Sequence, residues 1–148
     1  VLAGTAERAA DGTVRGGYVL GDTTPGSPPD VLLIATGSEV QLAVAAGATL
    51  SAEGVNARIV SMPCLEWFDQ QPREYRDSVL PPQVRARVAV EAGSTLSWWR
   101  IVGDGGRVVG IDHYGASADQ ATLFDEFGIT AGAVVQAAHQ SLEAASGR

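Results

Sequence analysis

The hydrophobic residues of this chain fall into short continuous runs that alternate with segments of helical spacing. The clearest run is Val31-Leu-Leu-Ile34, and four consecutive apolar residues suit a strand buried on both faces of a parallel sheet. The turn Thr36-Gly37 follows, and then one helical stripe of Val40, Ala43, Val44 and Gly47, with Gly54 where a helix would stop. A strand, a turn and a covering helix form the repeating unit of an α/β fold.

The same pattern predicts four more strands, at residues 17–20, 57–61, 87–91 and 107–112. Helices are expected at residues 72–79, 96–102, 117–127 and 131–142. The connection at residues 21–30 is rich in proline and too short for a crossover helix, so the first strand is expected to run antiparallel at an edge. The predicted fold is a three-layer α/β/α sandwich around a five-stranded, mostly parallel sheet.

The chain length of 148 residues fits one domain. Residues 1–14 lack periodicity and are expected to form a linker or extended arm. Residues 15–142 are expected to form the α/β domain, and residues 143–148 a frayed tail. The chain opens at Val1 and its only methionine is Met62, so we expect either a fragment of a longer protein or the product of tag removal.

Composition and charge exclude several classes of protein. A hydrophobic content of 45% with 18% charged residues is typical of a globular chain. The net charge of -7 repels a phosphate backbone, which argues against nucleic acid as a partner. A single cysteine excludes an internal disulfide framework and fits a reducing cytosol. Neither a membrane span nor a signal peptide is visible, so a cytoplasmic protein is expected.

Two predicted helix starts could bind an anion such as phosphate through their free backbone amides. Ser38 with Gln41, and Ser117 with Gln120, have the spacing of a capping box, and Glu39 favours the positive end of its helix. In the alternative interpretation the two serines already satisfy these amides as caps. The candidate anion-binding or interface residues are Gly37, Ser38, Glu39 and Ser117.

Cys64, His113 and either Asp112 or Glu91 follow predicted strands and could meet at one sheet edge as nucleophile, base and orienting carboxylate. No nucleophile-elbow motif accompanies them, and such edges collect polar residues because turns need them. We therefore predict no catalytic, cofactor-binding or metal-binding residue here.

The histidines and the paired tryptophans can also be considered as functional residues. His113 and His139 lack a second ligand at metal spacing, which argues against a metal site. Trp98 and Trp99 suit either an interface or the core.

Several phrases of the sequence resemble the C-terminal domain of transketolases. They are Arg15-Gly-Gly-Tyr-Val-Leu20, Ile34-Ala-Thr-Gly-Ser-Glu-Val40, Val60-Ser-Met-Pro63, Tyr75-Arg-Asp-Ser-Val-Leu-Pro81, Val88-Ala-Val-Glu-Ala-Gly93, Gly115-Ala-Ser-Ala118 and Phe127-Gly-Ile-Thr130. They occur in family order over nearly the whole chain. Cys64 stands where the family commonly has serine, which places it outside the family's chemistry.

The resemblance implies a five-stranded, mostly parallel sheet with its first strand antiparallel. It also implies a parent enzyme of the pentose phosphate pathway that transfers a two-carbon ketol unit from a ketose phosphate to an aldose phosphate. Such enzymes are homodimers that use thiamine diphosphate and magnesium or another divalent metal, held by their two upstream domains.

This chain alone is therefore expected to be inactive, with a structural, dimer-packing or regulatory role. Two alternatives stay open: a standalone regulatory module that binds a phosphorylated metabolite at the carboxyl edge of the sheet, and a thiol hydrolase that uses Cys64.

Overall fold

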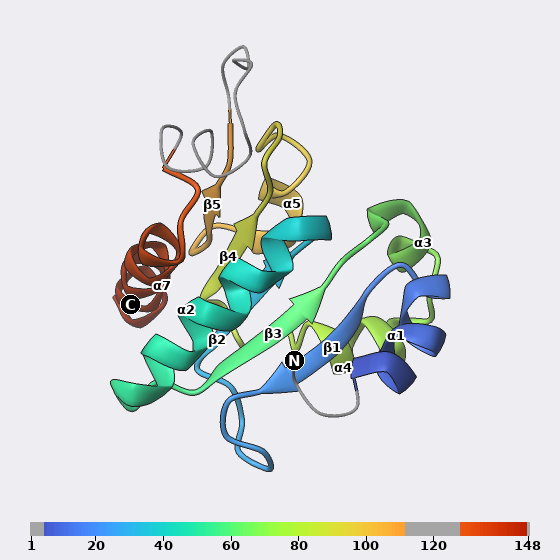
Figure 1. Ribbon diagram of the computed structural model, residues 1–148, viewed down its shortest axis with the longest axis horizontal. Coiled ribbons are helices and arrows are strands. Elements are labelled where there is room, and N and C mark those ends of the chain that lie inside the picture. The colour runs from blue at the N-terminus through green and yellow to red at the C-terminus, as the bar shows by residue number, and fades with distance from the viewer. Residues whose placement is uncertain (1–4, 112–127, 148) are drawn as a thin grey trace.

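The computed structural model describes residues 5–111 and 128–147, and these form a mixed five-stranded sheet (Figure 1). The strands are β1 (Tyr18–Asp22), β2 (Val31–Ala35), β3 (Ala57–Ser61), β4 (Arg87–Val90) and β5 (Arg107–Val109). Their order in the sheet is β1-β3-β2-β4-β5. Strand β1 pairs antiparallel with β3, and all the other pairs are parallel. The predicted sheet, including its antiparallel edge strand, is confirmed.

Helices cover both faces of this sheet, which gives the predicted three layers. The helices are α1 (Thr5–Val14), α2 (Val40–Ala52), α3 (Leu65–Asp69), α4 (Arg73–Val79), α5 (Trp99–Val102) and α7 (Ala131–Ser146), and a short 3-10 helix, η1 (Gly37–Glu39), precedes α2. Helices α2 and α7 lie on the face nearest the viewer in Figure 1. Helices α3, α4 and α5 pack against the opposite face.

Strand β2 shows why the sequence contains a continuous apolar run. All five of its side chains have an exposed fraction of 0%. Val31, Leu33 and Ala35 belong to the core under α2 and α7. Leu32 and Ile34 belong to the second core, with residues of α3, α4 and α5. Because successive side chains of a strand point to opposite faces, a central strand between two helical layers needs apolar residues at every position.

The expected arm at the start of the chain is wrong in its secondary structure, because residues 5–14 form α1. This helix contacts β1, and Arg8 Nη1 donates a hydrogen bond to the Leu20 carbonyl oxygen at 2.6 Å. Gly12 lies directly against the Tyr18 ring, where a Cβ atom would come within 2.2 Å of it. A ten-residue helix that contains glycine is marginal alone, so packing on β1 stabilises it.

The other boundaries follow the prediction to within a few residues. Helix α4 begins one residue after Pro72, which is its N-cap. Helix α3 was not expected, and β4, α5 and β5 are shorter than expected. Helix α7 continues to Ser146, so the prediction of a frayed tail is wrong for residues 143–146. The helix expected after Ser117 lies outside the described residues.

Candidate functional site

The carboxyl edge of β2 does not have the capping box that the sequence suggests. Residues 37–39 form η1, so α2 begins only at Val40 with Glu39 as its N-cap. Ser38 therefore precedes the N-cap, and its hydroxyl donates to Glu39 Oε1 at 3.2 Å instead of accepting from a helix amide. Gly37 has a φ of +56°, a left-handed conformation that glycine adopts without steric cost.

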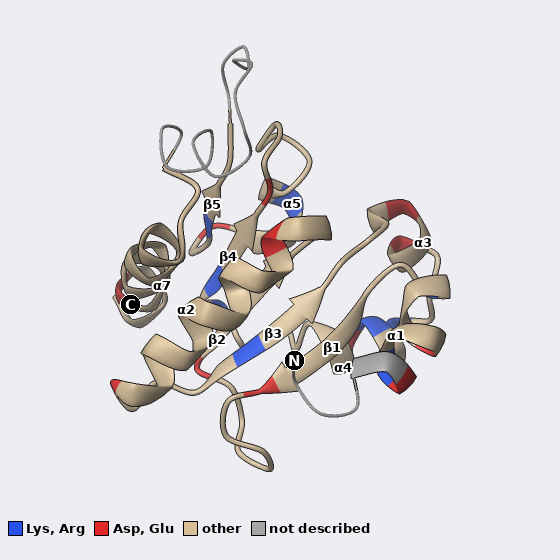
Figure 2. Ribbon diagram, in the orientation of Figure 1, with Lys and Arg blue, Asp and Glu red and all other residues tan. Residues whose placement is uncertain are grey.

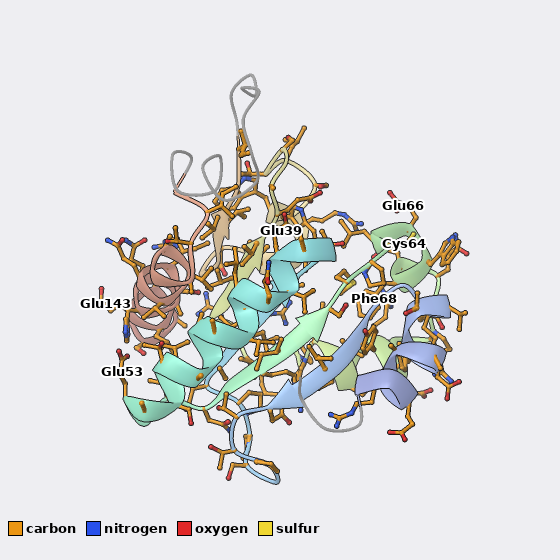
Figure 3. The ribbon with its side chains drawn as sticks, viewed as in Figure 1. Glu39, Glu53, Cys64, Glu66, Phe68 and Glu143 are labelled. Carbon is orange, nitrogen blue, oxygen red and sulfur yellow. The ribbon has the colours of Figure 1, made fainter. Side chains whose placement is uncertain are left out.

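Glu39 is the unusual residue of this turn, because its exposed fraction is only 6%. Figure 3 shows it at the start of α2, where the positive end of the helix favours a carboxylate. Its negative charge disfavours a phosphate at the same helix end. Anion binding at Gly37, Ser38 and Glu39 stays a prediction, and the fourth candidate, Ser117, lies outside the described residues.

The described members of the hypothetical Cys64 site each bond to another residue and not to one another. Cys64 Sγ donates to Glu66 Oε2 at 3.4 Å, and both residues lie at α3 (Figure 3). The Glu91 carboxylate instead accepts a hydrogen bond from the indole N–H of Trp98. His113 and Asp112 lie outside the described residues. The neighbour of Cys64 in the described residues is thus the Glu66 carboxylate, and the predicted histidine base is not among them.

The two adjacent tryptophans differ in burial. Trp98 is 2% exposed and fills the core beneath α5, so the core interpretation is confirmed for it. Trp99 is 48% exposed, and its indole N–H donates to Thr95 Oγ1 at 3.3 Å. A role of Trp99 at an interface stays a prediction.

A cluster of arginines that the sequence analysis missed lies between α3, α4 and α5. Arg73, Arg76, Arg87 and Arg100 line an open cavity of about 420 Å³, which we call the arginine pocket. Asp69 and Asp77 also line it. The available signal was the three-residue spacing of Arg73 and Arg76, which places both on one side of α4. Arg87 and Arg100 join them only through the tertiary fold.

Arg87 is fixed in this pocket by backbone oxygens. Its guanidinium donates to the carbonyl oxygens of Val84 at 2.9 Å, Ile101 at 2.9 Å and Pro81 at 3.0 Å. Burial lowers the pKa of this guanidinium, and the negative charge of Asp77 opposes that shift. Arg87 therefore ties the segment before β4 to α5, with most of its donors already used.

The two aspartates each pair with one arginine at the mouth of the pocket. Arg100 Nη2 lies 2.6 Å from Asp69 Oδ2, and this hydrogen bond raises the pKa of Arg100. Arg73 Nε lies 3.3 Å from Asp77 Oδ2. No hydrogen bond or ion pair joins the Arg76 side chain to any residue in the described part of the chain, and its Nε atom is buried.

A larger groove of about 720 Å³ lies between α2, β1 and the loop after β1. Its charged lining residues, Arg8 and Asp22, are already bonded. Arg8 binds the Leu20 carbonyl, and Asp22 forms an ion pair of 2.7 Å with Arg58. Figure 2 shows an acidic segment in β1 and a basic segment in β3. The groove therefore presents a mainly apolar surface to a ligand, because its charged side chains are already engaged.

The described residues contain no cluster of side chains suited to a metal ion. Within residues 5–111 and 128–147, no three His, Cys, Asp or Glu side chains come together as a metal site requires. No helix in that same part of the chain is long and apolar enough to cross a membrane.

Comparisons with known proteins agree on one family. Residues 16–130 match the family described as the transketolase-like TK C-terminal domain. The transketolase of Mycobacterium bovis is 61% identical over 137 residues, which cover 90% of this chain and 20% of that protein. The transketolase of Mycobacterium leprae is 59% identical over 145 residues, which cover 97% of this chain and 20% of that protein.

A solved structure supports the same assignment. The transketolase from Leishmania mexicana superposes with a TM-score of 0.81 at 39% identity, over 90% of this chain and 19% of that one. This chain thus spans about a fifth of the length of the relatives it matches. It belongs to the family of transketolase C-terminal domains.

Proposed function

We propose that this domain serves a longer transketolase polypeptide, which transfers a two-carbon ketol unit between ketose and aldose phosphates. The observation that carries the proposal is the match to about a fifth of the length of transketolases. In the complete enzyme, thiamine diphosphate and a divalent metal would supply the carbanion chemistry. We assign both to the other domains, and the lack of a metal-ligand cluster among the described residues supports this for the metal.

The role proposed for this chain itself is structural. We infer that the chain packs against the other domains of its own subunit and against the second subunit of a homodimer. Because the Glu91 carboxylate accepts a hydrogen bond from Trp98, it does not serve as an orienting group for Cys64 in the described contacts, which favours this role over a thiol hydrolase. The lone cysteine fits a reducing compartment such as the cytosol.

The test compares ketol transfer by the 148-residue chain with transfer by the complete polypeptide, each supplied with thiamine diphosphate and magnesium. Activity only in the complete polypeptide supports the proposal. Activity of this chain alone, at a rate comparable to that of the complete enzyme, would refute the non-catalytic role. Absence of activity in both would refute the ketol-transfer assignment.

A binding measurement separates the two parts of the proposal. Thiamine diphosphate with magnesium should leave the melting temperature of this chain unchanged, because only a ligand that binds the folded state stabilises it. The same addition should raise the melting temperature of the complete polypeptide. A rise in the isolated chain would place cofactor-binding residues in this domain.

A further inference from the structure

Arg76 differs from the other arginines of the described chain in lacking a partner. Arg58, Arg85 and Arg100 pair with carboxylates. Arg15 stacks on the Tyr75 ring, with its guanidinium carbon 4.7 Å from the ring centroid. The Arg76 side chain makes no hydrogen bond or ion pair with any described residue, although its Nε atom is buried. A buried donor without a partner is destabilising, and the terminal nitrogens of the same guanidinium are not buried and have no protein partner among the described residues.

The surroundings of Arg76 concentrate positive charge in a chain that is otherwise acidic. The arginine pocket has four guanidinium groups and the carboxylates of Asp69 and Asp77, which leaves an excess of two positive charges. The net charge of the whole chain is -7. A local excess of this kind, next to an unpaired guanidinium, attracts an anion.

We propose that the arginine pocket binds a phosphate group, either as the free ion or as the monoester of a small metabolite. At pH 7 such a group carries nearly the two negative charges that the pocket lacks. Guanidinium groups suit it because their planar N–H forks match the oxygens of phosphate. The terminal nitrogens of Arg76 bind it, and Arg73 and Arg100 contribute from the mouth of the pocket.

The dimensions of the pocket favour a small ligand over a polyanion. Its volume of about 420 Å³ falls in the range of small-molecule sites. An extended nucleic acid would have to approach across the acidic remainder of the surface, which repels it. Arg87 serves a different purpose, because its carbonyl contacts hold the floor of the pocket in place.

The site is distinct from the carboxyl edge of β2. The pocket is lined by residues of α3, α4 and α5 and by Arg87, the first residue of β4, whereas Gly37–Glu39 precede α2 on the other face. The proposal does not depend on catalysis by a longer polypeptide, so ketol transfer and phosphate binding can succeed or fail independently.

The experiment is calorimetric titration of inorganic phosphate into this chain at pH 7, with ionic strength held constant by sodium chloride. We expect saturable binding of one phosphate per chain. Arg76→Gln should weaken it by about tenfold or more, as the loss of a charge-assisted hydrogen bond implies. Arg73→Gln should also weaken it, and this residue is 84% exposed, so its replacement leaves the core intact.

The matched control is Arg85→Gln, which removes an arginine paired with Asp104 at 2.9 Å outside the pocket. Its dissociation constant for phosphate should stay within about twofold of the wild-type value. Circular dichroism should show that all three variants are folded. A second titration uses a pentose phosphate. If the ester binds more tightly than inorganic phosphate, the pocket is a site for a phosphate monoester. If the two bind equally, it is a site for the phosphate ion. Either result supports the proposal.

Three results would overturn the proposal. The first is heat that never saturates at constant ionic strength. The second is unchanged affinity in folded Arg76→Gln and Arg73→Gln. The third is an equal loss in Arg85→Gln, which would show that only overall charge matters.

Discussion

The hydroxyl group of Ser141 lies 2.7 Å from the carbonyl oxygen of Gly105, to which it donates a hydrogen bond. The same hydroxyl accepts a hydrogen bond of 2.9 Å from the backbone N–H of Arg87. Ser141 is 0% exposed, so one side chain of α7 joins the start of β4 to the turn before β5.

Replacing Ser141 by alanine should lower the free energy of unfolding by about 1–3 kcal/mol, because it leaves buried backbone groups unpaired. Urea denaturation measures this change. Ser146→Ala is the control, since this exposed hydroxyl bonds only to the Leu142 carbonyl in its own helix. This control should lower the free energy of unfolding by less than about 0.5 kcal/mol. Equal losses in the two variants would contradict the bridging role of Ser141.

Two glycines with nearly equal, positive φ angles allow backbone strain to be distinguished from steric crowding. Gly16 has a φ of +81° and Gly26 a φ of +83°. A Cβ atom on Gly16 would lie 2.3 Å from the Cys64 carbonyl oxygen, whereas one on Gly26 would meet nothing within 4 Å. Gly26→Ala should cost about 1–2 kcal/mol from conformation alone. Gly16→Ala should cost about 1–3 kcal/mol more through the clash, and thermal denaturation that ranks them equally would refute this.

The neighbouring tryptophans should respond very differently to truncation. Trp98→Ala should destabilise the chain by about 3–5 kcal/mol, because it empties a core position and removes the partner of Glu91. Trp99→Ala should cost less than about 1 kcal/mol, since nearly half of that side chain is exposed. Guanidinium denaturation followed by circular dichroism compares them. A larger loss at Trp99 would mean that its exposed face is already buried, for instance in a dimer.

Tyr75 should make stability depend on pH in the alkaline range. Its hydroxyl donates to the Gly17 carbonyl oxygen at 2.8 Å, and burial raises its pKa above the ordinary 10.0, against the opposing charge of Arg15. The folded state therefore keeps this proton where the unfolded chain loses it. The stabilisation is complete below pH 10 and is lost as pH rises through 10 and the folded pKa.

The measurement for Tyr75 is the slope of unfolding free energy against pH between about 9 and 11, in the wild type and in Tyr75→Phe. We expect the wild type to lose stability more steeply, and the variant to show only the contribution of the other titrating groups. Parallel slopes would show that Tyr75 titrates alike in the folded and unfolded states.

The central strands could be predicted because their burial on both faces requires a continuous run of apolar residues, which is visible in the local sequence. Strand β2 is buried on both faces, so every position is apolar, and β3 ends at Ser61 as predicted. Gly54, with a φ of +83°, follows α2 as a helix stop should. The short proline-rich connection before β2 correctly placed β1 at an antiparallel edge.

Features that depend on distant contacts were missed. Helix α1 depends on Arg8 and Gly12 meeting β1, and nothing in its own periodicity indicates this. The capping box failed because one turn of 3-10 helix moved the start of α2 beyond Ser38. The arginine pocket joins two residues of one helix to two that lie eleven or more positions further along, so only folding brings them together.

The packing of α1 beside β1 also bears on self-association (Figure 1). An edge strand offers unpaired backbone groups to any extended chain nearby, which makes it a template for aggregation. Here the Arg8 guanidinium donates a hydrogen bond to the Leu20 carbonyl oxygen, and α1 packs beside β1. Residues that look like a tether in the sequence thus shield the sheet from strand addition by another molecule.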